Sequence, residues 1–265
     1  MMKFPKWVLL PSVLFSICAS TSAFAGEEPW REEKGTHFIV HYLQNESFAK
    51  EILRKAENYY VSIAEELGYP RYSDFWQWDK RVQIYVYADK DAYLQASGQA
   101  EWSNGMADYV KKKIITYSDS ENFLEALLPH EIAHLIFRDF VGFQGQVPLW
   151  LDEGVAQWQE PGKRLWAKPT ALAMIQKLAV IPLRNLTGMN DLGREDPLQV
   201  PYFYAESVSL VDFMVKKYGT QSFTVFCRQL RDGKRLDEAL RSAYPGSIQD
   251  LDDLQERWIR YVTEQ

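Results

Sequence analysis

The stretch LPHEIAHLIF, residues 128–137, constrains the fold more than any other segment. His130, Glu131 and His134 stand in an otherwise apolar run, and residues 121–138 have the periodicity of a helix. Residues four apart lie on one face of a helix, so both imidazoles point the same way. Two neutral histidines buried on such a face need partners for their ring nitrogens, which makes a pure packing role costly. The stretch therefore favours a metal-binding helix.

The order of these residues is that of the H-E-x-x-H motif. Glu131 lies about 100° round the helix from His130, close enough to reach a water on a bound ion without binding the ion. A catalytic zinc site typically has three protein ligands and an open position for water. No histidine follows His134, so the third ligand must be an acid. Glu153, in PLWLDEGVAQWQE on a second helix, is the expected ligand, with 18 residues between it and His134.

H-E-x-x-H, then 18 residues, then W-L-x-E-G-x-A resembles the gluzincin zinc metallopeptidases. The resemblance is to the peptidase MA-like domains and, more distantly, to the catalytic domain of aminopeptidase N. The segments THFIVHY, VQIYVY and YAESVSLVDFMVKKYG fall in the order that those small domains use. The resemblance implies a zincin-like fold, Zn²⁺ held by His130, His134 and Glu153, and Glu131 as the catalytic base.

The chain also departs from aminopeptidase N. The G-A-M-E-N segment that grips a free amino terminus is missing, and the nearest strand reads NGMADYV. We therefore expect an endopeptidase, or a peptidase with one dedicated substrate, acting on a peptide or protein. Two alternatives stay open: a zincin-fold binding or scaffolding protein without turnover, and a zinc hydrolase of a non-peptide amide. The presence of Glu131 argues against the scaffold, which has no need of a base.

A donor for the oxyanion is expected from a tyrosine. Tyr204, in the context Tyr-Ala-Glu-Ser, is similar to the tyrosine that aminopeptidase N uses, and the resemblance implies this role for it. A packing tyrosine is the alternative interpretation. Tyr202 is the second candidate, but it points about 200° away round the same helix, so the two tyrosines are not expected to serve one site.

Further polar and aromatic residues have two interpretations each. Glu160 and Asp152 either orient the ligand imidazoles or are solvated helix acids. His37 and His41 are four apart in a strand, and hydrogen-bonded strand histidines are favoured over a second metal site. The aromatic segment 72–80 could be a stacking surface for a substrate, but a loop packed on the core is the favoured interpretation.

The remaining pattern predicts an α+β fold, with a mixed β-sheet in front and a mainly helical C-terminal lobe. Alternating and β-branched residues predict strands at 36–42, 82–87, 105–110 and 113–117. Besides 121–138, helices are expected at 47–67, 149–160, 170–178, 201–218, 222–230, 236–243 and 248–262. The irregular stretch 185–200 is typical of a loop that covers a site. We expect one domain over 26–265, with lobes meeting near residue 140.

The first 25 residues carry Lys3 and Lys6, an apolar run and then Ala23-Phe24-Ala25. This is the layout of a secretory signal peptide cleaved after Ala25. The apolar run is too short for a comfortable membrane span. We therefore expect an exported protein, periplasmic or extracellular, with no stable membrane span.

The expected mature chain is acidic. Removal of the two signal lysines leaves 28 basic residues against 36 acidic ones, a formal charge of −8. The charges are interspersed rather than gathered in a basic stripe, so nucleic acid is not an expected partner. Cys227 is the one cysteine left, and it cannot form an internal disulfide. The sequence gives no indication of an oligomeric state.

Overall fold

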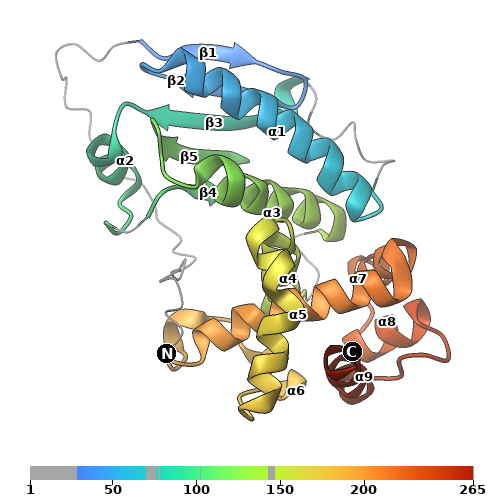
Figure 1. Cartoon of the computed structure of the whole chain (residues 1–265). Helices are drawn as coiled ribbons and strands as arrows, with labels where there is room; N and C mark the ends of the chain where they lie inside the picture. Colours follow the sequence, from blue (N-terminus) through green and yellow to red (C-terminus); the bar gives the residue numbers. More distant parts are fainter. Residues whose placement is uncertain (1–28, 70–75, 77, 102, 143–146, 265) are drawn as a thin grey trace.

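The computed structural model of the protein describes residues 29–69, 76, 78–101, 103–142 and 147–264 (Figure 1). The expected signal peptide lies outside the described residues, as does most of the aromatic segment 72–80. Among the helices of these ranges, none has the length and apolar character needed to cross a membrane.

The described residues include a five-stranded mixed β-sheet, which confirms the expected front half. β2, β3 and β5 run parallel, and the outer strands β1 and β4 run antiparallel to their neighbours. In spatial order the strands are β1 (Arg31–Lys34), β2 (Phe38–Tyr42), β3 (Val82–Tyr87), β5 (Lys113–Tyr117) and β4 (Met106–Asp108). The alternation in VQIYVY places every second residue of β3 on the buried face. β4 and β5 are the two strands expected within 105–117.

Two helices connect the strands of this sheet. α1 (Glu46–Glu66) joins β2 to β3, as expected, and α2 (Lys90–Ser97) lies between β3 and β4. The side chains of Asn45 and Asp89 accept hydrogen bonds from backbone N–H groups in the first turns, so both helices begin at a side-chain cap. α1 packs against β2 and against the helix that carries the histidines.

The second half is mainly helical, as expected. Its helices are α3 (Leu128–Val141), α4 (Leu149–Trp158), α5 (Pro161–Gln176), α6 (Leu183–Gly188), α7 (Val200–Arg231), α8 (Leu236–Ala243) and α9 (Leu251–Thr263). Short turns of helix occur at η2 (Trp78–Lys80), η3 (Phe123–Leu127) and η4 (Leu192–Arg194). At Gly219 the backbone φ is 84°, and this kink separates the two helices expected at 201–218 and 222–230.

Two expectations for this half were wrong. α5 begins at Pro161 instead of Thr170 and contains Pro169 in its interior. Pro161 suits a first helical turn, where its missing N–H costs no helical bond. Pro169 leaves the carbonyl of Leu165 without its helical partner. Leu165 is 73% exposed, so water can reach this turn. The stretch 185–200 is also not wholly irregular, because it contains the end of α6 and all of η4.

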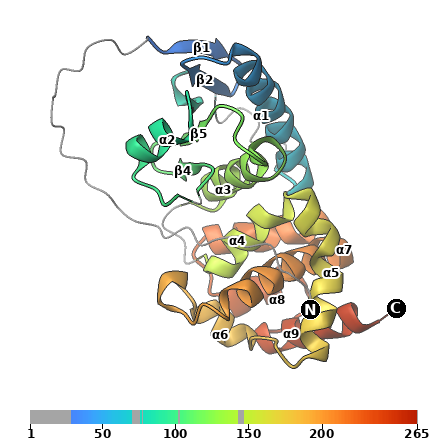
Figure 2. The same cartoon turned by 60° about the vertical axis from the view of Figure 1, so that its left-hand side comes forward.

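α3 lies between the sheet and the helices α4 and α7 (Figure 2). It packs against α1 on one side and against α4 and α7 on the other. One hydrophobic core runs through both halves, from Phe38 in β2 to Val262 in α9. The helix with the histidines therefore stands where the two halves of the fold meet.

Candidate metal centre

His130 and His134 occupy successive turns of α3, and both are buried. The turn η3 leads directly into α3, and Pro129 lies in the first turn of α3. The Nε2 atoms of the two rings lie 3.2 Å apart. The rings therefore converge, as the four-residue spacing predicts.

Glu153 of α4 reaches the same place from a second helix. Its Oε2 lies 3.9 Å from Nε2 of His130, and its Oε1 lies 3.8 Å from Nε2 of His134. One ligand atom from each of the three side chains lies within 4.8 Å of the others. The structure thus brings together the three residues that the sequence analysis selected.

The distance between the two imidazole nitrogens fits a tetrahedral metal ion. Two nitrogen ligands at about 2.0–2.1 Å from such an ion lie roughly 3.3 Å from each other, close to the observed 3.2 Å between the Nε2 atoms. The same distance also fits a hydrogen bond between two imidazoles. Glu153 favours the ion, because a histidine pair that bonded only to itself would not need a carboxylate facing both rings.

Gly154 allows α4 to lie close to α7. A Cβ at this position would stand 2.5 Å from the backbone oxygen of Ser207, closer than real Cβ contacts come. Only glycine permits this approach without a shift of backbone. Since Glu153 is the preceding residue, the same close packing sets where its backbone lies relative to α7.

Each histidine has a carboxylate partner on its other ring nitrogen. Nδ1 of His130 lies 2.9 Å from Glu160, and Nδ1 of His134 lies 2.8 Å from Asp152. Asp152 also accepts hydrogen bonds from the guanidinium of Arg138. Both acids thus take the orienting role considered for them, rather than that of solvated helix acids. Carboxylates at Nδ1 leave Nε2 of each ring facing Glu153.

The acidic side chains around the cluster favour the binding of a cation. Burial acts to lower the pKa of His130, but its hydrogen bond to Glu160, with the charges of Glu160, Glu131 and Glu153, raises that pKa to about 9. Burial raises the pKa of Glu153 against the opposing charges of the two histidines. In the absence of a metal ion, His130 therefore binds a proton at neutral pH. A metal ion must displace this proton, so proton and metal compete for the same nitrogen.

Glu131 lies beside the cluster and is completely buried. Its Oε2 accepts a hydrogen bond of 2.9 Å from the hydroxyl of Tyr109, and its Oε1 has no hydrogen-bond partner among the described residues. Burial and the charge of Glu131 raise the pKa of Tyr109 well above its ordinary value, so the phenol keeps its proton and donates. Tyr109 was missed in the sequence, where the segment NGMADYV gave no signal for this role.

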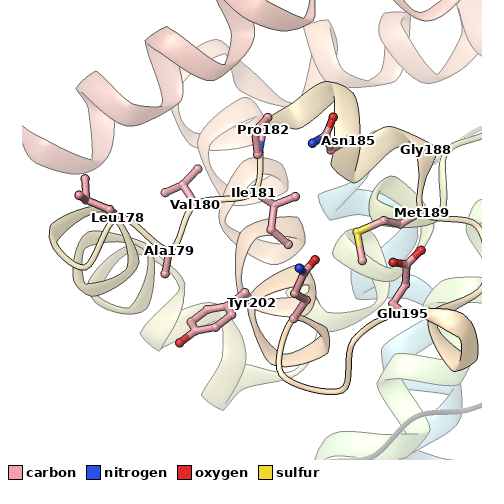
Figure 3. Close-up of a pocket in the computed structure, with 11 residues that line it drawn as sticks. Leu178, Ala179, Val180, Ile181, Pro182, Asn185, Gly188, Met189, Glu195 and Tyr202 are labelled. Atoms are coloured by element: carbon pink, nitrogen blue, oxygen red, sulfur yellow. The ribbon is translucent and has the colours of Figure 1, made fainter.

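Tyr204 and Tyr202 face different parts of the molecule. Burial, together with the charges of Glu153 and Glu160, raises the pKa of Tyr204, which therefore lies near the metal cluster as a protonated phenol. Tyr202 instead lines a groove of about 650 Å³ beside α6 (Figure 3). None of the potential metal ligands lines this groove, nor does Glu131. The charges of the cluster act on Tyr204, and its role as oxyanion donor stays a prediction.

The other histidines have partners of their own. His37 bonds to Glu57 of α1 at 2.7 Å, and His41 bonds to Gln83 of β3 at 2.7 Å. Both are hydrogen-bonded, as the sequence analysis favoured, but only His41 lies in a strand, because β2 begins at Phe38. In the aromatic segment 72–80, Trp76 is fully buried, whereas Trp78 is 83% exposed.

The fold and the site together define a metallopeptidase-like domain, in which an H-E-x-x-H helix and a following helix carry the potential metal ligands. The family model of the Peptidase MA superfamily matches residues 75–264 of the chain. This range is more than half of the sequence, and the protein belongs to the Peptidase MA superfamily. The match names the superfamily and does not extend to aminopeptidase N. No curated protein matches the chain.

Proposed function

We propose that the protein is an exported, zinc-dependent metallopeptidase, of endopeptidase type, that hydrolyses peptide bonds with Glu131 as general base. One observation carries the proposal. Two buried imidazoles and a half-buried carboxylate meet in one cluster, with a second carboxylate beside them that has an oxygen free of partners among the described residues. A purely structural metal site has no use for the second carboxylate.

The donor set favours zinc. Imidazole nitrogens and one carboxylate oxygen are ligands typical of catalytic zinc sites, which keep an open position for water. His130, His134 and Glu153 would hold the ion, and Glu160 and Asp152 keep the rings oriented toward it. When bound, zinc supplies positive charge that acidifies a water molecule and polarises the substrate carbonyl.

The protein residues would then move the proton and stabilise the developing charge. Glu131 takes a proton from the attacking water and passes it to the leaving amine, so that its carboxylate is restored at the end of each turnover. Tyr204, a protonated phenol near Glu153, donates a hydrogen bond to the oxyanion of the tetrahedral intermediate. Neither group is consumed in the overall reaction of a peptide bond with water.

The outer strand β4 supports a peptide substrate over a small amide. It pairs only with β5 among the described strands, so its other edge offers backbone groups to an extended chain. The chain has no G-A-M-E-N segment to bind a free amino terminus, and this favours internal cleavage over removal of terminal residues.

Metal analysis and two variants test the proposal. The purified mature protein should contain about one zinc ion per chain, and Glu153→Ala should lose it. Glu131→Gln should keep zinc and the fold but retain only a small residual turnover on an unbiased peptide library. Glu51→Gln, an exposed acid of α1, is the control for charge removal. The proposal is wrong if the protein binds no metal or if Glu131→Gln cleaves as fast as the parent.

Export is tested separately. Expression of the full chain in a host with a secretory pathway should give a mature protein that begins at Gly26, outside the cytoplasm. Amino-terminal sequencing of the fractionated protein measures this directly. Retention of Met1 on a cytoplasmic product would refute export and leave the metallopeptidase proposal intact.

A further inference from the structure

The carboxylate of Glu131 is held asymmetrically. Oε2 accepts the 2.9 Å hydrogen bond from Tyr109, while Oε1 is buried without a partner among the described residues. A buried carboxylate oxygen without a partner is costly, and such cases call for an explanation. A reaction partner for Oε1 during turnover would provide one.

Tyr109 is itself fixed in place from several sides. It directly follows β4, in the turn that leads to β5. The guanidinium of Arg138 lies 4.0 Å from the centre of its ring, and the ring of His134 is centred 5.3 Å away. Arg138 is held in turn by Asp152, the same acid that bonds to His134. One network therefore orients a ligand histidine and the phenol that contacts the base.

We propose that Tyr109 is a positioning residue for the base: it holds Oε2 of Glu131 so that Oε1 is the oxygen that takes the proton from the attacking water. This inference rests on the function proposed above. In the step, an O–H bond of water breaks, Oε1 gains the proton, and the oxygen of water bonds to the peptide carbonyl carbon as the C=O π pair moves onto the carbonyl oxygen. The C=O bond then re-forms, the C–N bond breaks, and the leaving nitrogen takes the proton from Oε1.

Tyr109→Phe tests the role with little change in packing, because the phenylalanine ring retains the contacts with Arg138 and His134. We expect kcat to fall roughly tenfold to a hundredfold, since a misaligned base loses the benefit of a fixed geometry. KM and zinc affinity should stay close to those of the parent. The melting temperature should fall by a few degrees, because Oε2 of the buried Glu131 loses its donor. Tyr117→Phe is the matched control, because Tyr117 also donates from this pair of strands, but to Asn104.

A double variant separates positioning from a general structural effect. If Tyr109 acts through Glu131, adding Tyr109→Phe to Glu131→Gln should cause no further loss of the residual rate. A loss in the double variant as large as in the parent background would overturn the inference, as would an unchanged kcat in Tyr109→Phe alone.

Infrared spectroscopy of the metal-free protein provides a measurement that needs no activity. The carboxylate band of Glu131 is identified as the band that disappears in Glu131→Gln. Tyr109→Phe should shift this band, because Oε2 loses its donor, and Tyr117→Phe should leave it in place. An unshifted band in Tyr109→Phe refutes the positioning role even if the protein proves not to be a peptidase. A shifted band without peptidase activity would refute only the proposed function.

Discussion

At the scale of single residues, the two histidines of the cluster are held by different acids. Glu160, between α4 and α5, bonds to His130, and Asp152, the residue before Glu153, bonds to His134. Asp152 has a second partner, because it also forms an ion pair with Arg138 at 2.5 Å. The two acids are therefore not equivalent, although both bond to an Nδ1 atom.

Glu160→Gln and Asp152→Asn should both weaken zinc binding, by about 10- to 100-fold, because the rings lose the acceptor that fixes their orientation. The loss should be larger for Asp152→Asn, which also leaves the charge of Arg138 without its partner. Competition titration with a chelator measures the affinities, and Glu51→Gln is the control. Equal affinities in the parent and both variants would contradict the orienting role.

Glu206 gives a prediction about pH. It is fully buried, and its Oε2 accepts a hydrogen bond of 3.0 Å from the backbone of Ile181. Burial raises its pKa from 4.5 to about 8. In the unfolded chain the carboxyl ionises near 4.5, whereas the folded protein keeps the proton. The stability that this group contributes is therefore complete below about pH 4.5 and is lost as the pH rises to about 8.

Glu206→Gln should remove this loss, because the amide keeps an oxygen for Ile181 and does not ionise. Near pH 5 the variant and the parent should have similar free energies of unfolding, and near pH 8 the variant should be more stable by a few kcal/mol. Urea unfolding at a series of pH values measures the difference. A difference that does not vary with pH would show that Glu206 is ionised in the folded protein.

At the scale of secondary-structure elements, the contact of α4 with α7 sets the geometry of the site. Gly154→Ala should lower the free energy of unfolding by about 1–3 kcal/mol, because the new methyl group meets the backbone of Ser207. Zinc affinity should fall as well, since Glu153 shifts with the helix. Gly162→Ala in α5 is the control: its Cβ would meet no atom within 4 Å. Chemical unfolding and chelator competition measure the two effects, and equal behaviour of both variants would contradict this account.

Elements with strong periodicity were predictable from the sequence, and weakly patterned ones were not. α1 and β3 show clear amphipathic patterns, and both were expected within one or two residues of their observed bounds. β1 was not expected, because its sequence REEK has no apolar alternation and it forms only by pairing with β2. α2 was also missed, since Tyr93 is its one fully buried side chain.

For the residues of the site, too, local patterns could be predicted from the sequence and long-range contacts could not. The spacing of His130 and His134 is a local property of a helix, so their convergence could be predicted. Glu153 could be selected because no later histidine was available. Tyr109 and Arg138 could not be found in this way, because their contacts depend on how the turn after β4 folds onto α3. Such contacts between distant segments have no signature in a single sequence.

At the scale of the whole molecule, the metal cluster bridges the two halves of the fold. α3 packs on α1, next to the sheet, whereas Glu153 comes from α4, which packs on α7. Other contacts cross the same boundary: Arg164 pairs with Glu66 at 2.6 Å, and Thr224 donates to the backbone oxygen of Leu67 at 2.8 Å. A bound ion would add a further link between α3 and α4.

Zinc should therefore stabilise the whole protein against heat. A ligand that binds only the folded state at a hundred times its dissociation constant stabilises by about 2.7 kcal/mol, which for a chain of this size raises the melting temperature by roughly 5–10 °C. Scanning calorimetry with zinc and with a chelator measures the difference. The increase should persist in Glu131→Gln, because Glu131 is not a ligand, and disappear in Glu153→Ala. If Glu153→Ala kept the full increase, zinc would be stabilising the protein from another position, and the link between α3 and α4 would not depend on this carboxylate.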